Sequence, residues 1–176
     1  MKKINMLLGG CLIWITLLAC GDSGNANQNQ NQTDVVKEEK TNPKPDKQVK
    51  KVIEIELIAQ GESMNEISFE PKILTIPENS TIKLTFINKS EAAGMFHNFV
   101  LVEQGSGQEV ATEGISAGKE NNFVPENNEN LIAYSPIADM GETLEIEFEA
   151  PPKGSYHYIC TYPGHYPAMI GRLIVE

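Results

Sequence analysis

The chain has 176 residues, and its 24 acidic and 14 basic side chains give a formal net charge of −10 at pH 7. This acid excess excludes nucleic acid as a partner, because binding to phosphates needs a basic face. Three cysteines are too few for a dense disulfide framework. The length suits one domain with a real hydrophobic core.

The N-terminus has the layout of a signal peptide: two lysines and then an apolar run over residues 4–19. The run is shorter than the roughly 20 residues that a membrane-spanning helix needs. Its end, Leu-Leu-Ala-Cys at 17–20, resembles a bacterial lipobox. We therefore expect residues 1–19 to be a lipoprotein signal peptide and Cys20 to carry the lipid, with an uncleaved membrane anchor as the alternative. Both place the rest of the chain in the cell envelope, outside the cytoplasm and held at a membrane.

A polar segment follows, from residue 20 to residue 50, rich in Asn, Gln, Lys and Pro. It contains too few apolar residues to offset the entropy of ordering, so we expect a disordered tether. Its five acidic and five basic residues cancel. Residues 51–176 hold 19 acidic and 7 basic side chains, a net charge of −12, and form the expected folded domain. A partner recognised by charge should therefore present a basic surface.

Short runs of alternating apolar and polar residues fill this domain and predict β-strands. Turn signals such as Pro77-Glu78-Asn79 and Pro152-Lys153-Gly154 separate them. The expected strands cover residues 52–58, 72–76, 81–87, 98–102, 143–148, 155–160 and 170–175. Such a pattern predicts an all-β domain, an antiparallel sandwich or barrel.

One long insertion, residues 104–130, interrupts the strand pattern. Ser106 and Glu109 have the spacing of a capping box, and Gly118 is a stop signal. The sequence therefore predicts one short helix in a flap that is otherwise a loop.

Residues with metal-binding chemistry gather near the C-terminus as Cys160, His165 and Met169, in the spacing C-x4-H-x3-M, and His97 lies upstream. Alone, each has an ordinary structural explanation: a solvated histidine, a core methionine or an inert buried thiol. Together, a thiolate, two imidazoles and a thioether are donors that suit copper in both oxidation states. Cys160 is also the only free thiol expected in the mature chain, because cleavage removes Cys11 and lipidation uses Cys20.

Two alternatives bear on this set. His157 should point to the face of its strand opposite Cys160, so we interpret it as a structural or surface residue. Zinc could bind the same donors, but closed structural zinc sites favour Cys₄ or Cys₂His₂ sets. The donor set therefore favours copper.

Three stretches carry a resemblance to a known family: His97–Val102, Leu131–Tyr134 with Gly141-Glu142, and Cys160–Met169. On these stretches residues 51–176 resemble the cupredoxins, and among them azurin and auracyanin. The resemblance implies a Greek-key β-sandwich with one type 1 copper at one end. It also implies single-electron transport between respiratory or photosynthetic partners.

The resemblance also assigns roles to individual residues. It implies that His97, Cys160 and His165 are equatorial ligands and that Met169 is the axial one. Asn98 would pair with the segment at Thr161, lock the two ligand loops together and hydrogen-bond the sulfur.

The sequence differs from azurins in three ways. The azurin disulfide is absent, Phe96 replaces a glycine, and Phe99 takes a place often held by tryptophan.

The expected function is a membrane-tethered electron carrier that is monomeric and is not an enzyme. Its partners would be redox proteins such as a cytochrome c, a membrane oxidoreductase or a terminal oxidase. We expect His165 to be the electron port, within an apolar docking patch of Tyr162, Pro163, Tyr166, Pro167 and Met95. The alternative is a copper-delivery or storage protein of the envelope, although the chain has neither a Met cluster nor a His tract. A multicopper enzyme would need more than the three histidines present.

Overall fold

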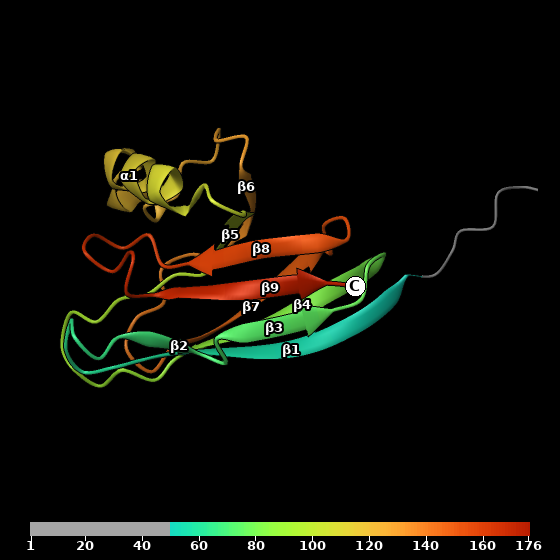
Figure 1. Cartoon of the computed structure of the whole chain (residues 1–176). Helices are drawn as coiled ribbons and strands as arrows, with labels where there is room; N and C mark the ends of the chain where they lie inside the picture. Colours follow the sequence, from blue (N-terminus) through green and yellow to red (C-terminus); the bar gives the residue numbers. More distant parts are fainter. Residues whose placement is uncertain (1–49) are drawn as a thin grey trace, which may run out of the picture. The chain divides into compact units, whose positions relative to one another are not determined.

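The computed structural model describes residues 50–176, which form two β-sheets packed face to face, with one α-helix at the side (Figure 1). This confirms the all-β sandwich with a short helix. The expected signal peptide, Cys20 and all but the last residue of the expected tether lie outside the described residues. Within residues 50–176, no helix is long and apolar enough to cross a membrane.

The two sheets have four and five strands. The first has the order β2-β1-β4-β7, with strands Ser68–Glu70, Lys51–Gln60, Ser80–Asn88 and Thr143–Glu149. The second has the order β3-β9-β8-β5-β6, with strands Ile73–Ile76, Ile170–Val175, Gly154–Ile159, Val100–Glu103 and Leu131–Tyr134. The short strands β2 and β6 were not predicted, because the first has three residues and the second, LIAY, shows no clear alternation.

Most strand pairs are antiparallel, as expected, but β1 pairs with β4 and β3 pairs with β9 in parallel, which the sequence did not predict. Between β1 and β4 the chain crosses to the second sheet to form β3 and then returns. Such a crossover brings β4 back in the same direction as β1, and strand periodicity in the sequence contains no record of that direction.

The space between the sheets is filled by the inward side of each alternating strand. In β4, Ile82, Leu84 and Phe86 are fully buried, whereas Lys83 between them is exposed. Phe99 also lies in this core and packs against the ring of Tyr158 at a centroid distance of 6.1 Å. Burying each such side chain contributes roughly 1.5–3 kcal/mol, so this core stabilises a domain in which the described residues contain no disulfide.

The flap contains the predicted helix, α1, from Gly107 to Ala117, which ends at Gly118 with φ of +81°. The predicted capping box is wrong, because the Ser106 hydroxyl donates to the carbonyl of Glu103 at 2.8 Å and does not cap the helix. A 3₁₀ turn, Lys119–Asn121, follows. A second, smaller core joins the helix to the outer face of β5 and β8.

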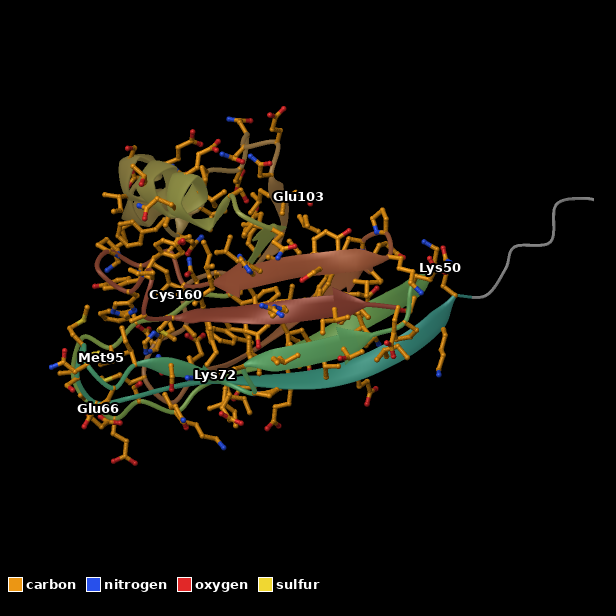
Figure 2. The ribbon with its side chains drawn as sticks, viewed as in Figure 1. Lys50, Glu66, Lys72, Met95, Glu103 and Cys160 are labelled. Carbon is orange, nitrogen blue, oxygen red and sulfur yellow. The ribbon has the colours of Figure 1, made fainter. Side chains whose placement is uncertain are left out.

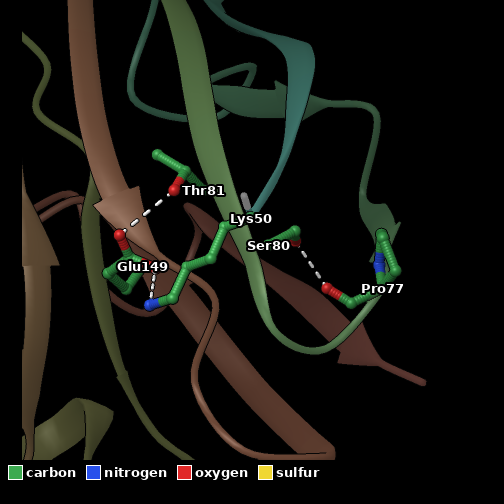
Figure 3. Close-up of polar contacts among 5 residues, drawn as sticks. All are labelled: Lys50, Pro77, Ser80, Thr81 and Glu149. Atoms are coloured by element: carbon green, nitrogen blue, oxygen red, sulfur yellow. Dashed lines mark hydrogen bonds and ion pairs between the residues drawn. The ribbon is translucent and has the colours of Figure 1, made fainter. Parts of the chain in front are cut away.

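The sandwich has two distinct ends, which Figure 2 shows through Lys50 at one end and Cys160 with Met95 at the other. At the Lys50 end, the Lys50 ammonium pairs with Glu149 at 2.7 Å and the Ser80 hydroxyl donates to the Pro77 carbonyl at 2.6 Å (Figure 3). We call the end that holds Cys160 the metal end. Strand β1 therefore begins at the end opposite Cys160.

Candidate metal centre

Three of the four residues expected to bind a metal come together at the metal end. The donor atoms of His97, Cys160 and His165 all lie within 4.8 Å of one another, and all three side chains are buried. The Cys160 sulfur lies 3.5 Å from Nδ1 of His165, and the two imidazole rings are 4.9 Å apart between centroids. The fold thus converts two distant stretches of sequence into one compact group of donors.

Cys160, His165 and Met169 are positioned by one tightly closed loop between β8 and β9. Pro163 and Gly164 occupy the centre of a turn that the His165 amide closes by donating to the Tyr162 carbonyl at 3.0 Å. Gly164 has φ of +86°, the conformation that the third position of a type II turn requires and that glycine adopts without strain. This turn directs His165 back toward the Cys160 sulfur.

Met169 closes the same loop and is fully buried. Its amide donates to the His165 carbonyl at 2.9 Å, and its carbonyl accepts from the Cys160 amide at 3.2 Å. The backbone of Met169 is therefore bonded directly to both of the other ligand candidates in the loop. Met169 thus belongs to the same closed loop as Cys160 and His165, from which its thioether would serve as a weak donor.

His97 reaches the centre from the segment between β4 and β5. It is paired with Ala138 across an isolated bridge, with the Ala138 amide 2.7 Å from the His97 carbonyl. Two backbone hydrogen bonds to one neighbouring segment hold its main chain, so the side chain projects from a fixed position.

The buried setting keeps the free imidazoles neutral. Burial, with a smaller contribution from the neighbouring His165, lowers the pKa of His97 to about 4, and burial alone lowers that of His165 to about 4. Both rings therefore offer a lone pair at neutral pH.

Burial acts on the thiol in the opposite direction, because it disfavours the charged thiolate. It raises the pKa of Cys160 to about 12, against the backbone hydrogen bonds from Asn98 and Tyr162 that favour the thiolate. A metal bound here must therefore displace the thiol proton.

One atom of the centre lacks a partner. Nδ1 of His97 is buried, and in the described part of the chain it is the one buried side-chain nitrogen or oxygen atom without a hydrogen bond. Burying an unpaired polar atom costs about 1–3 kcal/mol, so such atoms call for an explanation. A metal ion at the centre would use this lone pair. One cysteine sulfur, two neutral imidazoles and the buried Met169 of the same loop form a donor set that fits copper.

The amide of Asn98 connects three segments around the centre. Its nitrogen donates to Oγ1 of Thr161 at 2.8 Å and to the carbonyl of Asn122 at 2.9 Å, and its oxygen accepts from the amide of Thr161 at 2.9 Å. Asn98 follows His97, Thr161 follows Cys160, and Asn122 belongs to the flap. These bonds fix the spacing between the two segments that supply the donors.

Two further residues behind His97 were not identified from the sequence. Asn88 and Ser90 are buried, and the Ser90 hydroxyl lies 3.3 Å from Nε2 of His97. A signal for them exists: in β4 every second residue, Ile82, Leu84 and Phe86, points inward, and the next inward position is the polar Asn88. A polar residue on the apolar face of a strand indicates a buried hydrogen-bond network.

His157 lies apart from this group. It is half-buried, pairs with Arg172 across β8 and β9, and lines a shallow groove with Lys72 and Ile73. It is not part of the donor cluster, in line with the surface role predicted for it.

Aromatic rings pack around His165. The ring of Tyr162 is 4.8 Å from that of His165, and the rings of Phe96 and Phe123 pack against Tyr162 at 5.7 and 5.4 Å. These rings shield the donors from water.

Comparison with known proteins agrees with this chemistry. Residues 55–176 match the family model of copper binding proteins of the plastocyanin/azurin family. Auracyanin-A of Chloroflexus aurantiacus is 42% identical over 126 residues, which are 70% of this chain and 75% of the relative. Azurin iso-2 of Methylomonas is 30% identical over 125 residues, which are 68% of this chain and 95% of the relative.

Solved structures give the same result. The structure of auracyanin A from Chloroflexus aurantiacus, described as a "blue" copper protein, superposes with a TM-score of 0.64 at 39% identity and covers 71% of this chain and 99% of its own. Reduced auracyanin from Roseiflexus castenholzii gives a TM-score of 0.63 at 36% identity over 70% of this chain and 96% of its own. From its fold, its cluster of donors and these relatives, the chain belongs to the plastocyanin/azurin family of copper binding proteins.

Proposed function

We propose that this protein carries single electrons on one copper ion held by His97, Cys160, His165 and Met169. The observation that carries the proposal is the buried cluster of His97, Cys160 and His165, whose donor atoms lie within 4.8 Å of one another. The unpaired Nδ1 of His97 supports it, because an ion is the partner that this atom lacks. Copper bound there would supply a one-electron couple between Cu(I) and Cu(II).

The protein's own contribution is to hold the donors still. Electron transfer is fast when the donors move little between oxidation states. Cys160 and Met169 close one loop by a backbone hydrogen bond, and Asn98 joins that loop to the segment of His97. Such surrounding hydrogen bonds set the orientation of metal-binding side chains.

The centre is also closed. The side chains of Cys160 and Met169 are fully buried, and His165 is 1% exposed. Four donors within a packed core leave no obvious place for a substrate, which favours a carrier over an enzyme. A store or delivery protein would need donors that a second protein can reach, so the burial also favours the carrier.

The surface next to His165 is the proposed docking face. Pro163, Gly164 and Pro167 are exposed there, and Tyr162 and Tyr166 are half-buried. Met64, from the loop after β1, is 46% exposed, and its methyl group lies against Gly164. A redox protein docking on this face would reach the ring of His165 across a short, apolar contact. We propose that the carrier acts as a monomer.

The proposal includes an extracytoplasmic location in the cell envelope. The lipobox-like Leu-Leu-Ala-Cys at 17–20 supports lipidation of Cys20, and the polar segment that follows supports a tether. A lipid-anchored carrier would exchange electrons with partners in or near the same envelope.

The decisive experiment compares absorption and electron-spin-resonance spectra of the copper-loaded protein with those of Cys160→Ser. We expect intense blue absorption that Cys160→Ser abolishes, because the colour requires a thiolate bound to copper. Cys20→Ser is the matched control and should keep the colour. A colourless copper complex, or a blue Cys160→Ser variant, would contradict the proposal. A reversible one-electron wave would separate a carrier from a store of exchangeable copper.

A further inference from the structure

We propose that Ser90 is a positioning residue that sets which nitrogen of His97 faces the metal. The inference rests on the proposed function in one respect, that His97 binds the ion. It concerns the buried hydroxyl that contacts Nε2 of His97.

Counting protons gives the direction of each bond. The Ser90 hydroxyl, 1% exposed, lies 2.8 Å from the carbonyl of Gly61 and 3.3 Å from Nε2 of His97. A carbonyl only accepts and a hydroxyl has one proton, so that proton goes to Gly61. Toward His97 the Ser90 oxygen can then only accept. Both bonds exist together only if Nε2 of His97 carries the ring proton.

This assignment explains the unpaired atom. A neutral imidazole with its proton on Nε2 has its lone pair on Nδ1. Nδ1 of His97 is the buried atom without a hydrogen-bond partner, and His97 is a member of the donor cluster, so this lone pair is the one left free for an ion. Ser90 thus leaves the metal-facing nitrogen free of a proton before any ion arrives.

The Ser90 oxygen is itself held in place by the neighbouring loop. The amide of Lys89 donates to the carbonyl of Ala59 at 2.8 Å, and the amide of Glu91 donates to the Glu62 carboxylate at 3.0 Å. Between these two bonds lies Gly61, with φ of +117°, where an added Cβ would come within 2.6 Å of backbone atoms. Only glycine fits, so the accepting carbonyl has a fixed position.

Asn88 completes the support from the other side. Its side-chain oxygen accepts from the amide of Ser90 at 3.1 Å, and its nitrogen donates to the carbonyls of Met95 and Ala138 at 2.8 and 3.1 Å. Met95 and Ala138 flank His97 along the chain and across the bridge, respectively. Ser90 and His97 are therefore fixed relative to each other by one buried network.

Ser80 provides a matched control, because its buried hydroxyl has a purely structural role. Both serines are 1% exposed, and each donates to a backbone carbonyl, Ser80 to Pro77 at 2.6 Å. Ser80 lies near Lys50, at the end away from the donors (Figure 3). Replacing either by alanine removes one buried hydroxyl, but only Ser90→Ala should alter His97.

The test uses Ser90→Ala, Ser90→Thr and Ser80→Ala. Nitrogen-15 NMR of the copper-free protein reports which ring nitrogen of His97 is protonated, and chelator competition reports Cu²⁺ affinity. We expect one tautomer, with the proton on Nε2, in the wild type and in Ser80→Ala. In Ser90→Ala the tautomers should mix and Cu²⁺ affinity should fall about tenfold or more, the usual loss when the partner of a metal-binding histidine is removed. Ser90→Thr, which keeps the hydroxyl, should restore both.

The inference is overturned if Ser90→Ala retains the single Nε2-protonated form, or if its Cu²⁺ affinity equals that of Ser80→Ala. If Ser90→Thr does not fold, the comparison of the two alanine variants decides. His97→Ala separates this inference from the proposed function. A blue His97→Ala protein would contradict the metal-binding role of His97, whereas the tautomer measurement on the copper-free protein would still report on Ser90.

Discussion

The clearest quantitative prediction concerns Asn98, whose side chain joins three segments at the metal end. Asn98→Ala removes three hydrogen bonds, two buried ones to Thr161 and a partly buried one to the carbonyl of Asn122. The Thr161 hydroxyl can rotate toward another partner, but its amide and the Asn122 carbonyl are left without one. At about 1–3 kcal/mol for each unsatisfied buried group, the expected loss of stability is about 2–6 kcal/mol. That is a large part of the roughly 5–15 kcal/mol by which domains are stable.

The assay is urea unfolding of the copper-free protein, followed by far-UV circular dichroism. Copper-free protein is required because a bound ion would stabilise the folded state and mask the change. With a slope of about 1–3 kcal/mol/M, the midpoint should fall by at least about 0.7 M. Asn98→Asp keeps the oxygen that accepts from Thr161 but donates no hydrogen bond, so it tests the two donated bonds separately.

The matched control is Asn121→Ala. Asn121 is exposed and donates one hydrogen bond to the Ala117 carbonyl at 2.8 Å, so its loss should cost under about 1 kcal/mol. If Asn98→Ala costs no more than Asn121→Ala, then the buried amide does not join the segments and the reasoning fails. Asn98→Ala should also weaken Cu²⁺ binding, since the spacing between the segments of His97 and Cys160 would no longer be fixed.

Two further predictions concern acid stability and docking. The copper-free protein should lose stability as the pH falls from about 6.5 to about 4. In the unfolded chain His97 and His165 take up a proton near pH 6.5, whereas burial lowers their pKa in the folded protein to about 4. The expected loss is about 3 kcal/mol for each histidine. Urea midpoints between pH 7 and 4 measure this loss, and a slope as steep in His165→Asn as in the wild type would contradict it. Met64→Glu, at the exposed side chain against Gly164, should slow electron self-exchange between reduced and oxidised protein about tenfold. Val52→Glu adds the same charge at a similarly exposed position near the start of β1 and should leave the exchange rate unchanged; equal slowing in both variants would argue against the docking face.

Much of the fold could be predicted because burial follows strand periodicity. Glu145 and Glu147 alternate with apolar residues in the sequence and are exposed on β7, and Gly118 ends the helix as predicted. Strand direction could not be predicted, since a parallel pair such as β1 with β4 has the same alternation as an antiparallel one. The role of Ser106 was also misjudged, because its hydroxyl bonds to the nearby carbonyl of Glu103, a local alternative that the capping pattern does not exclude.

The metal centre, like the fold, could be predicted only in part. Cys160, His165 and Met169 could be grouped because they lie close together in the sequence around a Pro-Gly turn. The place of His97 depended on the fold. The inward position of Asn88 in β4 indicates a buried network, but the contact of Ser90 with His97 could not be predicted, because the Ser90 hydroxyl is also held by Gly61 in a distant loop. Residues that bind a metal are chemically distinctive, whereas residues that orient them are ordinary serines and asparagines.

The donors lie at the end opposite the start of β1, and this placement determines how the metal end of an anchored molecule would be oriented relative to its membrane. Strand β1 has ten residues, or roughly 33 Å at about 3.3 Å per residue, and this length separates the entry of the chain from the copper ligands. With Cys20 held in a lipid layer, residues 21–50 could extend at most about 100 Å further. The metal end would then face away from the membrane that holds the lipid. The extended segment would let it reach a large volume of the envelope. Redox partners that lie at a distance from this membrane, or in a membrane opposite to it, would contact the metal end first.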